Sequence, residues 1–183
     1  MIRIIAGKYK GRFLKVPDSK TTRPTMDKVR QAIFSAIKDK PLDAVVLDLF
    51  AGSGSMGLEA LSRGAKKVYF VDKDHKTFQV LKENATSLCD DKDVILLFNQ
   101  DYRLFLKRNT SIKFDLIILD PPYRYTINND IIEYMIKFDM LAKDAIIVSE
   151  QDYPNKEIEG LTLKEYRYGQ KHVGIYKKEE LWK

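Results

Sequence analysis

Residues 45–57, VVLDLFAGSGSMG, decide the fold of this chain. An apolar run ends in Asp48, a loop with glycines at 52, 54 and 57 follows, and LEALSRG continues with helical spacing. The pattern predicts a strand, a tight turn and a helix, because glycine adopts backbone angles that side chains forbid and lets the main chain approach a ligand. The same glycine spacing is also found in nicotinamide and flavin enzymes, so the rest of the chain must identify the ligand.

Composition limits the class of protein. The chain has 183 residues, a net charge of +6 and one cysteine. That length fits one domain with a real core, and a single Cys89 excludes an internal disulfide framework. No Cys/His spacing suits a metal, so we expect none. The start, MIRIIAGKYKGR, is no signal peptide, and no apolar run is long enough for a membrane span. We expect a cytoplasmic protein with no membrane contact, and its basic charge favours a polyanionic partner.

Strands and helices alternate after Pro41. Periodicity predicts strands at 45–50, 67–72, 93–98, 114–120 and 145–150, with helices at 54–63, 75–88, 102–107 and 128–138. A final antiparallel pair is expected at 163–168 and 173–178, and an earlier helix at 26–38 with Thr25 as its cap. Apolar strands separated by helices predict an α/β fold, a parallel sheet covered on both faces.

The first 24 residues differ from the rest and are interpreted as a basic hairpin extension, with the main domain at 25–183. Strands are expected at 2–6 and 12–16, around Gly7 and Gly11. Seven cations and one acid, Asp18, lie in this segment together with Tyr9 and Phe13. Phosphate contacts and base stacking would suit RNA, whereas a solvated basic hairpin is an equally good interpretation of this segment alone. The RNA-binding candidates are Arg3, Lys8, Tyr9, Lys10 and Arg12.

Four acids stand at or just past the ends of the first four strands of the main domain: Asp48, Asp72, Asp101 and Asp120. The carboxyl ends of parallel strands share one edge, which is where open α/β sheets bind ligands. Carboxylates disfavour a pyrophosphate but suit the ammonium, ribose and adenine amine of S-adenosylmethionine. Asp72 has the spacing of a ribose-binding acid, and Asp101 either accepts from the adenine amine or caps its helix. A cap or loop role is the usual one for a single such acid, but four together favour the methyl donor.

The sequence Asp120-Pro121-Pro122-Tyr123 is the clearest indication of the chemistry. Prolines cannot continue the ladder of a sheet, so they predict a stiff exit with outward carbonyls. A carboxylate, a carbonyl and an aromatic ring at the pocket mouth fit a planar substrate with an amino group. The carboxylate and the Pro121 carbonyl would accept the amine protons, while Tyr123 stacks on the ring. The alternative is an ordinary turn with a half-buried tyrosine.

These motifs resemble a known family. D-P-P-Y after a strand, with D-L-F-A-G-S-G-x-x-G in the first loop, is similar to amino-group methyltransferases that use S-adenosylmethionine. The segments R-I-I-A-G-K-Y-K-G-R-F-L and T-R-P-T-M-D-K-V-R-Q-A-I-F narrow the resemblance to the bacterial RsmD group, which methylates guanine N2 in 16S ribosomal RNA. The similarity extends from Arg3 to about Tyr176. It implies a Rossmann-like methyltransferase fold with a seven-stranded, mostly parallel sheet and an N-terminal hairpin.

The resemblance also implies a set of site residues. Catalysis is expected around Asp120, Pro121, Pro122 and Tyr123. Donor binding is expected from Asp48, Phe50, Gly52, Ser53, Gly54, Asp72, Lys73, Asp101 and Tyr102, with Arg23 and Thr25 near the donor or the target base. The expected partner is 16S ribosomal RNA in a small-subunit particle, and the expected state is a monomer. A methyltransferase of DNA bases or of a protein glutamine, and an RNA-binding module without chemistry, are the alternatives.

Overall fold

A computed structural model describes residues 2–17, 24–122 and 127–178, without the side chains of 24–26. Its main sheet contains β3 (Val45–Asp48), β4 (Lys67–Val71), β5 (Ile95–Phe98), β6 (Phe114–Leu119), β7 (Leu141–Gln151), β8 (Leu161–Tyr168) and β9 (Lys171–Lys178). The helices are α1 (Pro24–Ile37), α2 (Ser55–Ser62), α3 (His75–Leu88), α4 (Tyr102–Arg108) and α5 (Asn128–Lys137). Near the start of the chain, β1 (Ile2–Arg3) pairs with β2 (Phe13–Leu14) as an antiparallel hairpin.

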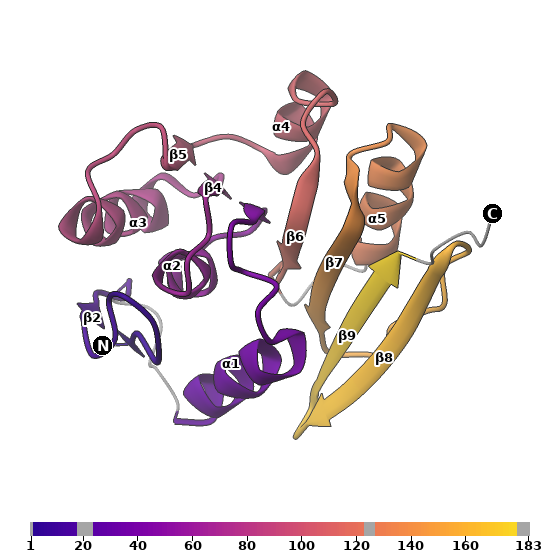
Figure 1. Ribbon diagram of the computed structural model, residues 1–183, viewed down its shortest axis with the longest axis horizontal. Coiled ribbons are helices and arrows are strands. Elements are labelled where there is room, and N and C mark those ends of the chain that lie inside the picture. Colours follow the sequence, from indigo (N-terminus) through magenta and orange to yellow (C-terminus); the bar gives the residue numbers. More distant parts are fainter. Residues whose placement is uncertain (1, 18–23, 123–126, 179–183) are drawn as a thin grey trace.

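The seven strands lie in the order β5-β4-β3-β6-β7-β9-β8 (Figure 1). Strands β3 to β7 run parallel to one another, and β9 is antiparallel to both β7 and β8. The order reverses beside β3, because the chain first builds outward to β5 and then returns to β6 on the other side. The parallel sheet and the final antiparallel pair predicted from the sequence are both confirmed.

Two apolar layers cover the two faces of the sheet. Alternate residues of a strand point to opposite faces: Val46 packs with α1, α2 and α3, whereas Leu47 packs with α4 and α5. The same alternation separates Ile118 from Ile117 on β6. This three-layer arrangement explains why the strands are apolar at nearly every position, as expected for a sheet covered on both sides.

The hairpin packs on the layer of α1, α2 and α3 (Figure 1). Ile2 and Leu14, a cross-strand pair, both face this layer and are buried. The buried Glu59 of α2 accepts hydrogen bonds from the backbone N–H groups of Ile5 at 2.8 Å and Ala6 at 3.1 Å. The described part of the hairpin therefore belongs to the same core as the sheet. The division at residue 24 stays a prediction.

One local prediction is wrong. Helix α1 begins at Pro24, so Thr25 lies inside its first turn and is not the residue that caps it. Proline is favoured at the first helical position, where its fixed φ suits the helix and its missing N–H needs no partner. Thr25 was expected to be the cap because the hydroxyl of threonine can accept a hydrogen bond from a helix N-terminus. That expectation left out the preference of proline for the first helical position. Strand β7 is also longer than predicted, since it begins at Leu141 rather than Ala145.

Candidate functional site

The loop between β3 and α2 has the backbone geometry that its glycines allow. Gly52 and Gly54 have φ of +57° and +86°, a region that residues with side chains rarely adopt. A Cβ on Gly54 would lie 2.5 Å from Cδ1 of Leu81, whereas a Cβ on Gly52 would meet no described atom within 4 Å. Gly54 thus lets the loop pack against α3, and Gly52 leaves open space above it, as a ligand on the main chain requires.

Asp72 follows β4 and holds this loop from the side. Its Oδ2 accepts from the Gly52 N–H at 2.8 Å, and its Oδ1 accepts from the Asp74 N–H at 2.9 Å. Gly52 and Asp72 are 20 positions apart in the sequence, and this hydrogen bond brings the acid to the glycine. Asp72 is partly exposed, so its carboxylate borders both the loop and the open edge. Lys73, next in the chain, is exposed.

Asp48 lies beneath the loop and is only 2% exposed. Its Oδ2 accepts from the Gly57 N–H at 2.9 Å, and a Cβ on Gly57 would clash with the Phe70 ring at 2.3 Å. Burial raises the pKa of Asp48 to about 7, helped by the nearby charge of Asp72 and opposed by the Gly57 N–H. Direct contact between Asp48 and the donor stays a prediction. The described contact fixes the start of α2.

Asn84 of α3 is a loop contact that the sequence analysis missed. Its Nδ2 donates to the Ser53 carbonyl at 2.8 Å and to the Lys15 carbonyl at 2.9 Å, while its Oδ1 accepts from the Lys15 N–H at 2.8 Å. Asn84 is 3% exposed. One amide therefore joins the glycine loop to the chain that follows the hairpin. No periodic pattern marks it, because its partners are 31 and 69 positions away.

Phe50 and Tyr102 border the other side of the loop. Their ring centroids are 5.2 Å apart at 55°, and the Arg103 guanidinium lies 4.8 Å from the Tyr102 centroid. Asp101 caps α4, since its Oδ1 accepts from the Arg103 N–H at 2.9 Å. The structure thus shows the helix-cap role that the sequence offered for Asp101. The second carboxylate oxygen lies 3.6 Å from the Arg103 guanidinium.

The turn after β6 lies at the same edge of the sheet. Strand β6 ends at Leu119, and Asp120 is exposed, Pro121 buried and Pro122 exposed. The parallel register of β3 with β4 and β6 brings the ends of these strands together, so Asp48, Asp72 and Asp120 share the carboxyl edge. Tyr123 and Arg23 lie outside the described residues, as does the side chain of Thr25.

The candidate cations of the hairpin are exposed, although the Arg12 guanidinium also donates to the Ser87 carbonyl of α3 at 2.9 Å. These cations are Arg3, Lys8, Lys10 and Arg12. Tyr9 is half-buried against the core, and Lys8 Nζ lies 5.2 Å from its ring centroid. Phe13, which the sequence analysis named with Tyr9 as an aromatic residue of the basic segment, is 61% exposed and is the cross-strand partner of Arg3. Strand alternation accounts for this exposure, because Leu14 points inward and its neighbour must point outward.

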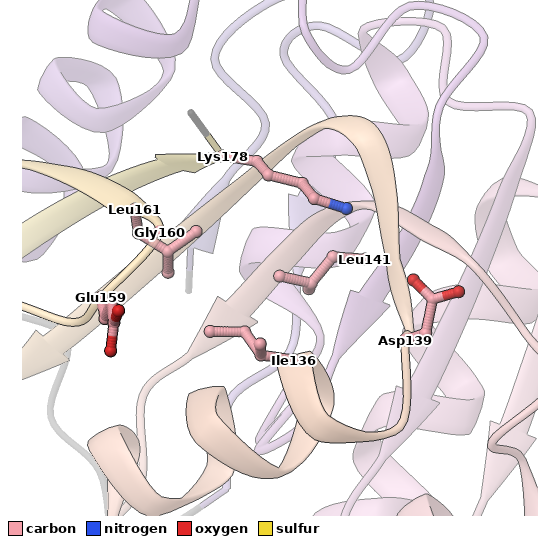
Figure 2. A pocket seen from close by; sticks show the side chains of 7 residues that line it. All are labelled: Ile136, Asp139, Leu141, Glu159, Gly160, Leu161 and Lys178. Atoms are coloured by element: carbon pink, nitrogen blue, oxygen red, sulfur yellow. The ribbon is translucent and has the colours of Figure 1, made fainter. Parts of the chain in front are cut away.

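One pocket lies away from this edge (Figure 2). Its lining includes Ile136, Leu141 and Leu161, with Asp139, Glu159 and Lys178 at its rim. Leu141 pairs with Phe114 at the amino end of β6, so the pocket is at the opposite edge of the sheet. Its volume of about 180 Å³ is below the ~300 Å³ at which ligand pockets begin. This pocket is therefore not part of the candidate site at the carboxyl edge.

Within residues 2–17, 24–122 and 127–178, no helix is long and apolar enough to cross a membrane. The same ranges contain no cluster of three or more His, Cys, Asp or Glu that could hold a metal ion.

The strand order, the glycine loop and the acids at one edge define a Rossmann-like methyltransferase fold. The solved Escherichia coli structure of yhhF has a TM-score of 0.85 at 33% identity, over 97% of this chain and 98% of its own. YlbH of Bacillus subtilis is 39% identical over 97% of this chain and 99% of its own. Ribosomal RNA small subunit methyltransferase D of Haemophilus influenzae is 37% identical over 88% of this chain and 86% of its own.

The family described as Conserved hypothetical protein 95 matches residues 2–177. The chain belongs to this family, and the predicted resemblance to the RsmD group is confirmed.

Proposed function

We propose that this protein transfers a methyl group from S-adenosylmethionine to the exocyclic N2 amine of one guanine in 16S ribosomal RNA. The enzyme class and the donor agree with the relatives, one of which is named ribosomal RNA small subunit methyltransferase D. The observation that carries the proposal is the edge itself. It brings an open glycine loop with two carboxylates beside an exit turn of one acid and two prolines.

The donor half fits the chemical groups of S-adenosylmethionine. The open space above Gly52 accommodates a ligand against the main chain, and the partly exposed Asp72 carboxylate is placed to accept from ribose hydroxyls. Ser53, Gly54 and Lys73 complete the loop side. Phe50 and Tyr102 supply an aromatic wall for the adenine, with Asp101 beside it. Arg23 and Thr25 are proposed at the boundary between donor and target base.

Asp48 acts beneath this surface. Its hydrogen bond to Gly57 fixes the first turn of α2 and so the position of the glycine loop. When bound, the donor supplies an electrophilic methyl group on a sulfonium. The residues around it orient the donor and keep the loop in place, so their effect appears in donor affinity.

The acceptor half orients a poor nucleophile. A guanine amine is conjugated with its ring, so its lone pair must be localised and directed at the methyl carbon. The Asp120 carboxylate and the Pro121 carbonyl hold the two amine protons, and Tyr123 fixes the plane of the ring. Held in this way, the nitrogen would form its bond to the methyl carbon as the carbon–sulfur bond breaks, and the donor would leave as the neutral thioether. The extra proton on the nitrogen would then pass to solvent, so no strong base is required.

The hairpin supports the choice of RNA. The target base must leave its stack to reach the edge, which favours an unpaired or splayed guanine. Exposed Arg3, Lys8, Lys10 and Arg12 would contact the phosphates of such a segment. Among the aromatic residues, Phe13 is more accessible than Tyr9 for stacking. We propose that the protein acts as a cytoplasmic monomer on a small-subunit particle.

The decisive experiment uses tritiated S-adenosylmethionine with purified protein and four acceptors: small-subunit particles, free 16S RNA, DNA and total protein. The expected result is label in ribosomal RNA alone, recovered as N2-methylguanosine after nucleoside digestion and mass analysis. Label in DNA or in protein glutamine would establish one of the alternative substrates. Methylation of a ring nitrogen would contradict the amine mechanism, and no transfer at all would leave an RNA-binding module.

A further inference from the structure

A chain of buried polar side chains lies at the carboxyl end of β7, next to the turn after β6. Asn128 is the first residue of α5, Ser149 is on β7 and Asn155 follows β7. They are 1%, 0% and 7% exposed. Three segments of the chain thus bring polar groups together inside an otherwise apolar layer. Neither the fold nor the proposed catalytic residues require them.

The hydrogen bonds among these three polar side chains run in one direction, from Asn128 through Ser149 to Asn155. Asn128 Nδ2 donates to Ser149 Oγ at 2.7 Å, and Ser149 Oγ donates to Asn155 Oδ1 at 2.7 Å. Asn128 Nδ2 also lies 3.4 Å from the Glu150 carbonyl. A carbonyl only accepts, so this second contact fixes which end of the Asn128 amide faces β7. Ser149 links the other two side chains, because its hydroxyl accepts from Asn128 and donates to Asn155.

Gly174 of β9 leaves space for the Asn155 side chain. It is the register partner of Ser149, and a Cβ on it would lie 2.6 Å from Cγ of Asn155. Any larger residue there would displace the Asn155 amide from the Ser149 hydroxyl. Gly174, on a strand far along the sequence, therefore leaves the space that the Asn155 side chain fills.

Ser149 touches both described ends of the turn. Its other register partner is Leu119, the residue before Asp120, and its hydroxyl holds Asn128, where α5 starts after the turn. Backbone pairing fixes the exit from β6, and a side-chain hydrogen bond fixes the entry to α5. One residue of β7 thus sets the distance between the two points that the turn must connect.

The hydrogen bonding of these polar side chains is incomplete. Among the described residues, Asn128 Oδ1 and Asn155 Nδ2 have no hydrogen-bond partner. Asn84, equally buried, has partners for both ends of its amide. Buried polar atoms in folded proteins are nearly always paired. A cluster that served stability alone would be better satisfied, as Asn84 is.

We propose that Asn128 and Ser149 are positioning residues for the segment that leaves β6 at Asp120 and Pro121. They act through the Ser149 hydroxyl, which holds the start of α5 at a fixed place beside the end of β6. The inference rests on the proposed function, because it assigns the turn to the target amine. Loss of the hydroxyl should leave the donor site unchanged, since Asp72 and the glycine loop have separate contacts.

The test compares S149A and N128D with the control T86A, which removes an exposed hydroxyl that bonds only within α3. S149A deletes one oxygen, and N128D keeps the shape but removes the donor. Both should lower kcat by roughly 10–100-fold, as displaced reactive groups do. Donor affinity measured by calorimetry should stay at the value of T86A. Hydrogen exchange should become faster in residues 120–127 and stay unchanged in the glycine loop.

The pH profile of N128D gives a second readout. A protonated carboxyl can donate to Ser149 again, so kcat of N128D relative to wild type should rise as the pH falls. A residue that only filled space would show no such recovery. S149A has no titrating group at this position and should follow the pH profile of wild type.

Three results would overturn the inference: exchange in 120–127 equal to that of T86A, faster exchange with unchanged kcat, or a loss of donor affinity equal to the loss of kcat. The proposed function fails differently. If wild type transfers no methyl group to RNA, the exchange measurement still decides whether Ser149 and Asn128 restrain the turn.

Discussion

The loop after β3 and the turn after β6 face the same edge of the sheet, but they are held in different ways. Three side chains bond directly to the backbone of the glycine loop and its helix: Asp72 to Gly52, Asn84 to Ser53 and Asp48 to Gly57. The turn after β6 is held at its ends, by the pairing of Leu119 with Ser149 and by Asn128. The first arrangement fixes the loop on which we propose that the donor binds. The second fixes the two described ends of the segment to which we assign the target amine.

This comparison predicts that substitutions separate by region. Changes at the glycine loop should act on donor affinity, and changes at the turn should act on turnover. Mixed effects would show that the edge works as one unit.

The largest effect is expected at the turn itself. Asp120→Ala should lower kcat by about 10²–10³-fold, comparable with removal of one preorganised group that acts in the transition state. Donor affinity should remain nearly intact, which is the signature of an interaction made in the transition state. Methyl transfer under donor saturation measures it. Asp144→Ala, an exposed acid on β7 away from the turn, is the matched control. Near-normal turnover of Asp120→Ala would remove the turn from the mechanism.

The next effect tests the glycine loop. Asp72→Ala removes the ribose acceptors and the hydrogen bond to Gly52, and should weaken donor binding by about 1–3 kcal/mol. Titration calorimetry checks it. Asp74→Ala is the control, because Asp74 is exposed and caps α3 through Thr77 without a bond to the loop. Equal donor affinity of the two variants would place the ribose elsewhere.

A pH experiment sharpens the difference between buried and exposed acids. The pKa of Asp48 is about 7 in the folded protein, above its ordinary value of 3.8. An acid with a raised folded pKa adds stability at low pH, and this stability is lost as the pH rises through the folded pKa. Between about pH 5 and pH 8, wild type should lose about 2 kcal/mol of unfolding free energy relative to Asp48→Asn. Urea unfolding at both pH values measures the difference, and parallel curves would contradict it.

Substitution of the exposed cations of the basic hairpin should change neither donor affinity nor protein stability by much. Replacing Lys8, Lys10 and Arg12 together by Ala should weaken RNA binding and reduce the slope of log affinity against log salt by about 2–3. Donor binding should survive. Replacement of exposed Lys137, Lys143 and Lys156 gives the same change in net charge away from the hairpin. If both triple variants lose the same affinity, net charge and not a hairpin contact attracts the RNA.

The smallest expected effect concerns Phe13. Phe13→Leu keeps an apolar side chain but removes the ring, and should weaken binding of an RNA with an unpaired target region by about 1 kcal/mol. Phe138→Leu is the control, because Phe138 is also exposed, at 42%, but lies at the end of α5. Fluorescence of 2-aminopurine placed in the RNA reports stacking. No change in quenching with Phe13→Leu would assign the ring another role.

The periodic elements and the motif acids were predictable from the sequence for a physical reason. The apolar run at 114–119 and the helical stripe of α3 are local patterns, which burial on two faces imposes on consecutive residues. The spacing of Gly52 and Asp72 was also informative, because one helix, α2, and one strand, β4, separate them in a fixed geometry.

Contacts between distant segments were not predictable in this way. The bonds of Asn84 to Lys15 and Ser53, and of Ser149 to Asn128, join residues whose sequence neighbourhoods give no sign of each other. The prominence of Phe13 over Tyr9 depends on which side of the hairpin faces α2 and α3. That choice follows from packing of the whole domain.

The place of β9 has a consequence for synthesis of the protein. It is the last strand of the described residues, yet it lies inside the sheet between β7 and β8. Until a ribosome has translated residue 178, β7 has an open side and Gly174 cannot make room for Asn155. A nascent chain can therefore assemble its glycine loop early, whereas the edge beside the turn closes only after β9 has been synthesised. We expect chains truncated before Lys171 to expose the β7 edge and to aggregate.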